Sequence, residues 1–244
     1  MTTESKVIVE AEGIVKVLGA GASENKVLKG VDLQLHTGEL TLMMGPSGSG
    51  KTTLLSILGC ILSPTQGRLT IGGLQTHTMN KEQLAKLRRK HVGFVFQSYN
   101  LVPTLSAVEN VMLALDLRDL NGPDAYDQAA DALEAVGLGH RIKAMPSKMS
   151  GGEKQRVSIA RALAGSPSVI LADEPTAALD AKNGLAVMEL LAKVAQDTRR
   201  AVLAVTHDHR TLPYADRIIT IDDGRIAGSE RPKLTEKAVE MAAH

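Results

Sequence analysis

The fold is decided by one stretch of the sequence, Leu40-Thr41-Leu42-Met43-Met44-Gly45-Pro46-Ser47-Gly48-Ser49-Gly50-Lys51-Thr52-Thr53. Its glycines, Lys51 and Thr52 match the phosphate-binding loop pattern at every fixed position. Glycines at this spacing let backbone N–H groups wrap a polyphosphate, while the lysine reaches the β- and γ-phosphates and the threonine hydroxyl binds Mg²⁺. The stretch therefore predicts a nucleoside triphosphate site, with Gly45 to Thr53 as its binding residues.

The flanks of this loop supply the context that the pattern requires, since short glycine-rich patterns also occur by chance. The apolar residues 40–44 predict a buried strand before the loop, and residues 53–58 predict a helix after it, whose positive end would face the same phosphates. In this context the alternative, a flexible turn rich in glycine and serine, is disfavoured. Cys60, the single cysteine, falls in the same helix, which predicts a small buried side chain without a chemical role.

The composition is that of a globular chain with nearly balanced charge. Its 244 residues include 28 Lys and Arg against 27 Asp and Glu, for a net charge of +1. This balance disfavours a nucleic-acid partner, because such proteins usually carry a basic excess. The first residues lack the apolar core of a signal peptide, and no apolar run approaches the roughly 20 residues of a membrane span. We therefore expect a cytoplasmic chain.

The patterns on either side of the loop predict an α/β fold. Alternating polar and apolar residues at 7–9 and 31–35 predict an antiparallel β-layer at the N-terminus. The runs at 169–172 and 201–205 are apolar throughout and are separated by a helical pattern, which predicts parallel strands buried on both faces. Between residues 106 and 164 only helical patterns occur, which predicts a helical insertion.

These patterns predict one domain over residues 1–230, followed by a short polar tail at 231–244. The core of the domain would comprise about residues 1–97 and 160–230, and an inserted helical subdomain would comprise about residues 98–159. No internal repeat or low-complexity segment interrupts this plan.

Two acidic residues, Asp173 and Glu174, follow the apolar run that ends at residue 172. They would emerge at the rim of the sheet that carries the phosphate loop, where one carboxylate can hold Mg²⁺ and the other can orient the attacking water. Gln97 follows another apolar run and would lie at a strand's carboxyl end, where ligands bind in open α/β sheets. The alternative is a solvated strand end, which the nearby phosphate loop disfavours.

A second glycine-rich segment, Ser150-Gly151-Gly152-Glu153, precedes the helical pattern at 157–163. Two glycines and a hydroxyl at the start of a helix make an anion site, because N–H groups are free there and the helix dipole is positive. One nucleotide does not need two such sites in a monomer. We therefore interpret the segment as facing the nucleotide of another copy, in a head-to-tail dimer that closes around two ATP molecules. An ordinary serine-capped helix is the alternative.

Together these motifs make the chain resemble the ATP-binding subunit of an ATP-binding-cassette (ABC) transporter. The resemblance covers roughly residues 7–227, with the motifs in the family order. It implies a P-loop NTPase (RecA-like) core with an N-terminal antiparallel β-layer and an inserted helical subdomain. The matching residues are Gly45 to Thr52, Gln97 after Phe96, Ser150 to Glu153, Leu171 to Pro175, Ala178 to Asp180, and His207 within Val205 to Asp208.

The resemblance implies a role for each matched residue. Gln97 would sense Mg²⁺ and the γ-phosphate and couple them to a membrane partner, while Glu174 would polarise the attacking water and His207 would contact the γ-phosphate. Asp180 would lie across the dimer interface, and Ser150 with its glycines would bind the γ-phosphate of the opposite protomer. The implied catalytic residues are Glu174, His207, Gln97 and Lys51, and the implied metal ligands are Thr52, Gln97 and Asp173.

Within the family, the wording at residues 88–97, 171–180 and 205–208 is most similar to the macrolide-exporter and lipoprotein-releasing group, and closer still to the DevA-type exporter ATPases. This similarity implies a homodimer of ATPase subunits on the cytoplasmic face of the inner membrane. It also implies a separate integral membrane permease and, in many such systems, a periplasmic adaptor. The transported substrate, and the choice between export, lipid extraction and mechanotransmission, would depend on the permease.

Two positions depart from the family pattern. Family members usually stack an aromatic ring on adenine, but residues 15–19 hold no aromatic side chain and Leu18 is the nearest match. Leu18 offers apolar contact without a π face, so we expect a looser grip on the base. Glu153 stands where glutamine is commoner, although glutamate also occurs in the exporter group.

Other classes of function are weaker fits to the sequence. A soluble ABC-type ATPase acting on nucleic acid, chromosomes or ribosomes usually carries coiled coils, zinc modules or two cassettes, and this chain shows one compact cassette. A nucleotide kinase or switch GTPase would leave Ser150 and its glycines without a purpose. A zinc site at His207-Asp208-His209 is disfavoured because no further ligand cluster accompanies these residues.

Overall fold

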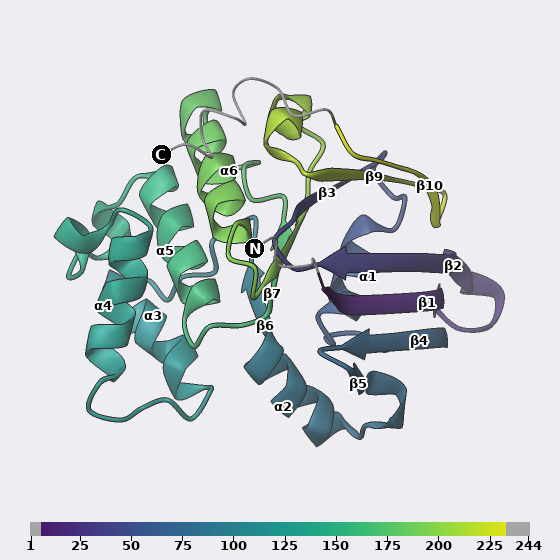
Figure 1. The fold of residues 1–244 in the computed structure, drawn as a ribbon, viewed down its shortest axis with the longest axis horizontal. Coiled ribbons are helices and arrows are strands. Elements are labelled where there is room, and N and C mark those ends of the chain that lie inside the picture. Colours follow the sequence, from purple (N-terminus) through teal and green to yellow (C-terminus); the bar gives the residue numbers. More distant parts are fainter. Residues whose placement is uncertain (1–5, 233–244) are drawn as a thin grey trace.

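The computed structural model describes residues 6–232, which form two β-sheets and a group of helices (Figure 1). Of the predicted tail at 231–244, residues 233–244 lie outside the described residues. The strands are β1 (Val7–Leu18), β2 (Asn25–His36), β3 (Leu40–Met44), β4 (Gln66–Ile71), β5 (Leu74–Gln75), β6 (Val92–Val95), β7 (Val169–Asp173), β8 (Ala201–Val205), β9 (Arg217–Asp222) and β10 (Arg225–Glu230). The α-helices are α1 (Lys51–Leu58), α2 (Lys81–His91), α3 (Ala107–Asp116), α4 (Ala125–Ala135), α5 (Gly151–Leu163) and α6 (Ala181–Ala195).

The central sheet has six strands in the order β10-β9-β3-β8-β7-β6. Strands β9, β3, β8, β7 and β6 are parallel, and β10 pairs with β9 in the antiparallel sense. The predicted parallel pairing of residues 169–172 with 201–205 is confirmed, since Ile170 aligns with Val202 and Ala172 with Ala204. Because the strands are parallel, their carboxyl ends meet at one edge, and this edge positions the site described below.

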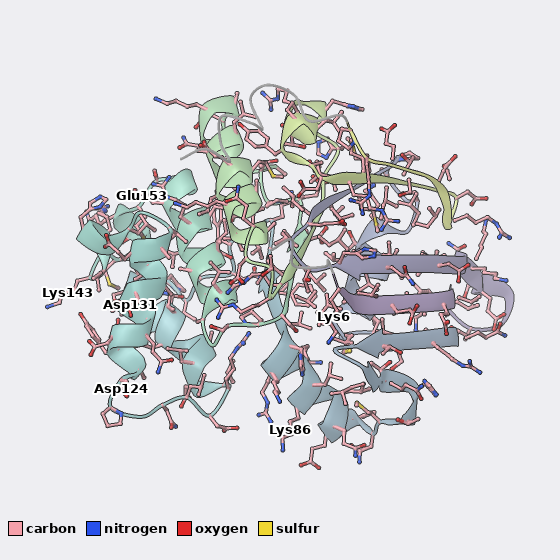
Figure 2. The ribbon with its side chains drawn as sticks, viewed as in Figure 1. Lys6, Lys86, Asp124, Asp131, Lys143 and Glu153 are labelled. Atoms are coloured by element: carbon pink, nitrogen blue, oxygen red, sulfur yellow. The ribbon has the colours of Figure 1, made fainter. Side chains whose placement is uncertain are left out.

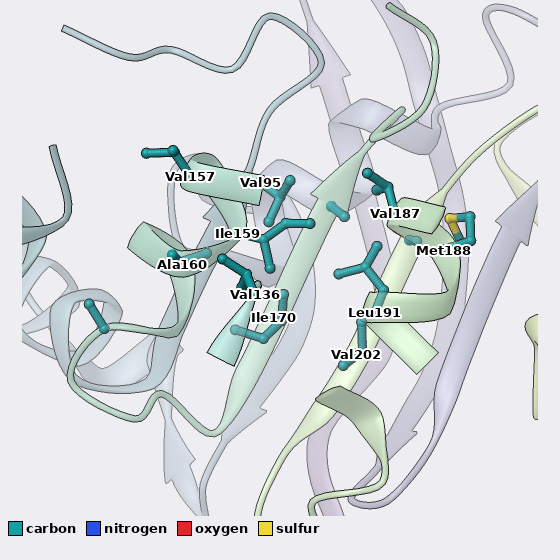
Figure 3. Close-up of a cluster of buried hydrophobic side chains, with 14 of the residues drawn as sticks. Val95, Val136, Val157, Ile159, Ala160, Ile170, Val187, Met188, Leu191 and Val202 are labelled. Carbon is teal, nitrogen blue, oxygen red and sulfur yellow. The ribbon is translucent and has the colours of Figure 1, made fainter. Parts of the chain in front are cut away.

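Both faces of the central sheet are buried, which explains why its strands are apolar without alternation. Successive residues of one strand belong to two different cores. In β8, Val202 and Ala204 pack among the helices, whereas Ala201, Leu203 and Val205 pack toward the antiparallel sheet. Figure 3 shows part of the helical core, where Ile170 and Val202 from the sheet lie near Ile159 and Leu191 from the helices.

The second sheet has the order β2-β1-β4-β5 and is antiparallel throughout, as the alternation near the N-terminus predicts. Strands β1 and β2 extend well beyond the predicted residues 7–9 and 31–35. Several register shifts interrupt the alternation of polar and apolar residues along the pair, so the sequence pattern revealed only part of each strand. The inner face of this sheet packs with α1 against the central sheet. The predicted N-terminal β-layer is therefore confirmed.

Helices α3, α4 and α5 pack against one another on the side of the molecule away from the antiparallel sheet (Figure 1). Their outer surface is charged, with Asp124, Asp131 and Lys143 exposed there (Figure 2). Helix α5 also packs on β6, so it joins the helical group to the central sheet. The expected boundary near residue 159 falls inside α5, and the division into core and subdomain stays a prediction.

The structure corrects the placement of Cys60, which was expected in the helix after the phosphate loop. That helix, α1, ends at Leu58, and Cys60 adopts a left-handed conformation with φ of 55° in the following turn. The Arg88 guanidinium donates to the Cys60 carbonyl at 2.8 Å and fixes this turn. The expected burial is confirmed, and burial raises the pKa of the Cys60 thiol to about 11. The thiol is therefore unreactive at neutral pH.

Within residues 6–232, every helix is too short or too polar to cross a membrane.

Candidate functional site

A cleft of about 810 Å³ opens beside the phosphate loop, at the carboxyl edge of the central sheet. It brings together residues that are far apart in the sequence, including the loop after β3, Gln97 after β6, Glu174 after β7 and His207 after β8. Its lining residues are Asn25, Val27, Gly45, Pro46, Ser47, Gly48, Gly50, Lys51, Thr52, Thr53, Gln97, Glu174, Ala177 and His207.

The phosphate loop is held in its curved form by its own backbone and by Lys51. Gly45 has φ of 152°, and a Cβ there would lie 2.0 Å from the Ile221 carbonyl oxygen of β9, so the position requires glycine. The Lys51 ammonium donates to the Gly45 and Pro46 carbonyls, both at 2.8 Å, which places its charge across the mouth of the loop. The N-terminus of α1 opens into the same loop and favours an anion there.

Ser49 belongs to the phosphate loop but lies outside the cleft lining. Its hydroxyl oxygen is buried and has no hydrogen-bond partner among the described residues, and Ser49 is only 3% exposed. The Ser49 N–H donates to the Pro46 carbonyl at 3.3 Å, and the Ser49 carbonyl accepts from the Gly224 N–H at 3.1 Å. Ser49 therefore holds the loop to the turn before β10.

Thr52, Asp173 and Gln97 offer oxygen atoms that suit Mg²⁺. The Thr52 hydroxyl donates to Asp173 Oδ1 at 3.3 Å, so these two side chains already meet. Burial raises the pKa of the Asp173 carboxyl, and the hydrogen bond from Thr52 opposes that rise. A hydroxyl, a carboxylate and an amide oxygen are ligands that Mg²⁺ prefers. The three residues therefore fit a bound Mg²⁺ ion.

Glu174 is held in an unusual conformation at the end of β7. Its φ is 46°, a left-handed value that is rare for a residue with a side chain, and its N–H donates to the Val205 carbonyl at 2.9 Å. Its carboxylate accepts a hydrogen bond from His207 Nδ1 at 2.9 Å, because a carboxylate oxygen cannot donate. The Glu174 side chain is 17% exposed and that of His207 is 72% exposed, so the pair stands at the cleft surface.

The Ser150 turn, which comprises Ser150 to Glu153, lies outside the cleft lining. Ser150 caps α5, since its hydroxyl accepts from the Glu153 N–H at 3.2 Å and the Glu153 carboxylate accepts from the Ser150 N–H at 2.8 Å. The Ser150 N–H lowers the pKa of the Glu153 carboxyl, and Arg141 pairs with the same carboxylate at 3.0 Å. The serine-capped helix is therefore real, and the turn is already formed in the monomer.

Four further predicted residues also lie outside the cleft lining, namely Ser49, Asp173, Asp180 and Leu18. Asp180 caps α6, where its carboxylate accepts from the Asn183 N–H at 3.0 Å. Leu18 ends β1, is 41% exposed and pairs with Asn25 across the hairpin, so its contact with a base stays a prediction. Next to His207, the Asp208 carboxylate pairs with Arg210 at 2.7 Å instead of pointing to a common centre with the histidines.

The sequence analysis missed three residues of the cleft: Asn25 and Val27 of β2, and Ala177. Asn25 and Val27 lie in the antiparallel sheet, and they reach the cleft only because that sheet folds over the phosphate loop. The antiparallel sheet lies so close to the loop at Gly50 that a Cβ there would be 2.8 Å from the Leu28 side chain. Gly224 is a second such position, since a Cβ there would lie 2.3 Å from the Val27 carbonyl oxygen.

A glycine-rich loop between a buried strand and a helix, with two acids at the end of a neighbouring parallel strand, defines a P-loop nucleoside triphosphatase. Residues 28–177 match the sequence model of the family described as ABC transporter. The chain belongs to the ABC transporter family, as an ATP-binding cassette, which is the ATPase module of that family.

Relatives and solved structures support this assignment. The chain is 42% identical over 231 residues to the macrolide export ATP-binding/permease protein MacB of Wolinella succinogenes, covering 95% of this chain and 36% of that protein. It is 42% identical to an ABC transporter ATP-binding protein of Thermotoga maritima, with 93% of this chain and 96% of the relative covered. The chain thus spans about a third of the length of the MacB relatives that it matches, 36% and 37%.

Among solved structures, a dimeric ATP-binding cassette in a post-hydrolysis state, bound to ADP and Pi, is similar with a TM-score of 0.83. It is 39% identical and covers 93% of this chain and 99% of its own. The cassette comes from Methanocaldococcus jannaschii. The predicted fold class is therefore confirmed, with the P-loop core, the antiparallel β-layer and the inserted helices all present.

Proposed function

We propose that the chain is the motor subunit of an ABC exporter, in which ATP binding closes two copies head to tail and hydrolysis reopens them. The observation that carries this proposal is the division of the site. The cleft gathers the phosphate loop, Gln97, Glu174 and His207, but the preformed Ser150 turn stands outside it. A second copy would bring its own Ser150 turn to this cleft. The similarity to a dimeric cassette with bound ADP and Pi supports the arrangement.

The chemistry would rest on positioning and charge stabilisation, which dominate phosphoryl transfer. The loop N–H groups and Lys51 would hold the β- and γ-phosphates, and the Ser150 turn of the second copy would close over the γ-phosphate. Thr52, Asp173 and Gln97 would hold Mg²⁺, which neutralises phosphate charge when bound.

Glu174 would orient the attacking water and accept its proton as the bond to the γ-phosphorus forms and the bond to the leaving ADP oxygen breaks. The hydrogen bond from His207 fixes one carboxylate oxygen of Glu174 and leaves the other for water. The left-handed backbone at Glu174 aims the carboxylate into the cleft. His207, which is exposed in the monomer, would reach the γ-phosphate once the dimer closes over it.

The proposed partner is an integral membrane permease, which places the chain on the cytoplasmic face of the inner membrane. The MacB relatives are named ATP-binding/permease proteins, and this chain matches about a third of their length. A separate permease, as in the DevA-type systems, is the form that we propose, together with a periplasmic adaptor. The near-complete coverage of an ABC transporter ATP-binding protein from Thermotoga maritima supports a separate ATPase subunit.

Co-purification tests the proposed partner. A tagged chain is recovered from detergent-solubilised membranes of its native cells, in parallel with the Lys51→Ala variant, whose loop lacks the phosphate-binding ammonium. A multi-spanning membrane protein should be recovered with the tagged chain and should change its ATPase rate. Recovery of ribosomes or DNA in place of a membrane protein would contradict the proposal and favour a soluble ABC-type ATPase acting on nucleic acid or ribosomes.

A further inference from the structure

Two consecutive residues just after Gln97 adopt a conformation that side chains disfavour. Tyr99 has φ of 61° and Asn100 has φ of 50°, both in the left-handed region. Within residues 6–232 this is the one place where two neighbouring residues other than glycine share that conformation. A bulky residue such as tyrosine rarely adopts it, so surrounding contacts must hold the segment in place.

Arg161 of α5 supplies those contacts. One terminal nitrogen of its guanidinium donates to the Tyr99 carbonyl at 2.7 Å, and the other donates to the Asn100 carbonyl. The planar guanidinium matches two adjacent acceptors at once, and hydrogen bonds from a charged donor are stronger than neutral ones. Burial lowers the pKa of the Arg161 guanidinium, which nonetheless stays charged at neutral pH.

The Tyr99 side chain connects this segment to two other parts of the site. Its hydroxyl donates to the Ala178 carbonyl at 3.4 Å, two residues before Asp180. A Cβ on Gly151 would lie 3.0 Å from the same hydroxyl oxygen, so Tyr99 also stands against the Ser150 turn. The segment after Gln97, the segment before Asp180 and the Ser150 turn therefore meet at Tyr99.

We propose that Tyr99, Asn100 and Arg161 form a clasp that links the two nucleotide sites of the dimer, with Arg161 and Tyr99 as positioning residues. In the head-to-tail dimer of the proposed function, on which this inference rests, Gln97 faces the nucleotide of its own chain and the Ser150 turn faces that of the partner. The clasp fixes these two elements relative to each other within one chain. Nucleotide bound against Gln97 therefore determines where the Ser150 turn of the same chain lies relative to the second copy.

The test is ATP-driven dimerisation of Arg161→Gln, made in the Glu174→Gln background so that ATP persists. Sedimentation gives the dimer dissociation constant with ATP, and a fluorescent ATP analogue gives the nucleotide affinity of the monomer. The clasp predicts that dimerisation weakens by at least about tenfold, within the range usual for coupling between sites. Nucleotide affinity of the monomer should stay within about twofold, because the phosphate loop is untouched.

A rescue distinguishes positioning from packing. Glycine adopts the left-handed region without cost, so Asn100→Gly added to Arg161→Gln should recover most of the lost dimerisation. The matched control is Arg118→Gln, because Arg118 is a half-buried arginine that also donates to a backbone carbonyl, that of Val92 at 3.0 Å, away from the clasp. This control should leave ATP-driven dimerisation unchanged.

Each outcome decides a separate point. If the Glu174→Gln parent does not dimerise with ATP, the proposed function fails and the clasp fails with it. If the parent dimerises and Arg161→Gln dimerises equally well, the clasp alone is wrong. If Asn100→Gly does not restore dimerisation, Arg161 acts only through the packing of α5 and not by holding Tyr99 and Asn100. Should Arg161→Gln not fold, Tyr99→Phe decides: the clasp predicts weaker dimerisation from loss of the hydroxyl, and an unchanged constant overturns it.

Discussion

Glu174 shows how a single residue of the site is held in place at an energetic cost. Its left-handed backbone costs about 1–2 kcal/mol for a residue with a Cβ. The N–H bond to Val205 and the carboxylate bond from His207 offset that cost and fix the carboxylate in the cleft. Strain of this kind is common at active sites, where the surrounding structure holds a residue in a conformation that it would not adopt alone.

Glycine and alanine at position 174 should separate this strain from the loss of the carboxylate. Both variants lack the acid and should not hydrolyse ATP. The free energy of unfolding should be about 1 kcal/mol higher for Glu174→Gly than for Glu174→Ala, because the left-handed backbone is strained for alanine but not for glycine. Urea unfolding measures the difference. Glu189, an exposed residue within α6, provides the control, since alanine should there be more stable than glycine by about 1 kcal/mol. If alanine were more stable than glycine at position 174 as well, the backbone at Glu174 would not be strained.

Glu174→Gln tests the chemical role of the same residue. The amide keeps the size of the side chain but is a far weaker base, so ATP should still bind while turnover falls by at least about 10²-fold. Single-turnover hydrolysis together with ATP binding measures the two effects. Undiminished hydrolysis would show that another group orients the attacking water.

At the residue scale, sequence reasoning works where the chemistry is local. Gly45 to Thr53 are contiguous, so their spacing alone predicts the loop, and the structure places Gln97, Glu174 and His207 around the same cleft. Asn25 and Val27 escaped prediction because their contact with the cleft arises from the packing of one sheet on another. The contact between Tyr99 and Arg161 was not predicted, since a left-handed tyrosine and its distant arginine leave no local pattern.

The elements of the central sheet were predictable in proportion to their burial. Strands β7 and β8 pack on two cores and are therefore apolar throughout, which is a strong signal. Strand β10 was missed, because most of its residues are exposed and it pairs only with β9 at the edge of the sheet. The sequence feature that indicates β10 is the turn at Asp223-Gly224, which joins it to β9 and in which both residues adopt the left-handed conformation.

Helix α5, which follows the Ser150 turn, packs closely on β6, which precedes Gln97. A Cβ on Gly93 of β6 would lie 2.2 Å from the Ala162 carbonyl oxygen of α5, a backbone atom that cannot rotate away. Gly93→Ala should therefore push α5 outward, lower the free energy of unfolding by about 1–3 kcal/mol and weaken ATP-driven dimerisation.

Thermal or urea unfolding measures the stability of Gly93→Ala, and sedimentation measures its dimerisation. Gly228→Ala in β10 is the matched control, because a Cβ there meets nothing within 4 Å, and its effect should stay within about 0.5 kcal/mol. An unchanged free energy of unfolding in Gly93→Ala would show that α5 can move away from β6 without cost, which contradicts this account.

At the scale of the whole molecule, the Ser150 turn lies outside the cleft that the phosphate loop lines. The cleft holds the phosphate loop and the catalytic candidates, while the Ser150 turn is completed by Glu153 and Arg141 outside that cleft. If the Ser150 turn of a second copy completes the site, as we propose, a monomer would bind ATP but would lack the donors that enclose the γ-phosphate. The similarity to a dimeric solved cassette supports this proposal.

The most direct test of this account is the rate of ATP hydrolysis per molecule as a function of protein concentration. Light scattering on the same samples reports the oligomeric state. If the active site is composite, the specific rate should be low in dilute, monomeric protein and should rise with concentration to a plateau as dimers form. A specific rate that stays constant across a range where the chain is shown to be monomeric would contradict the composite site.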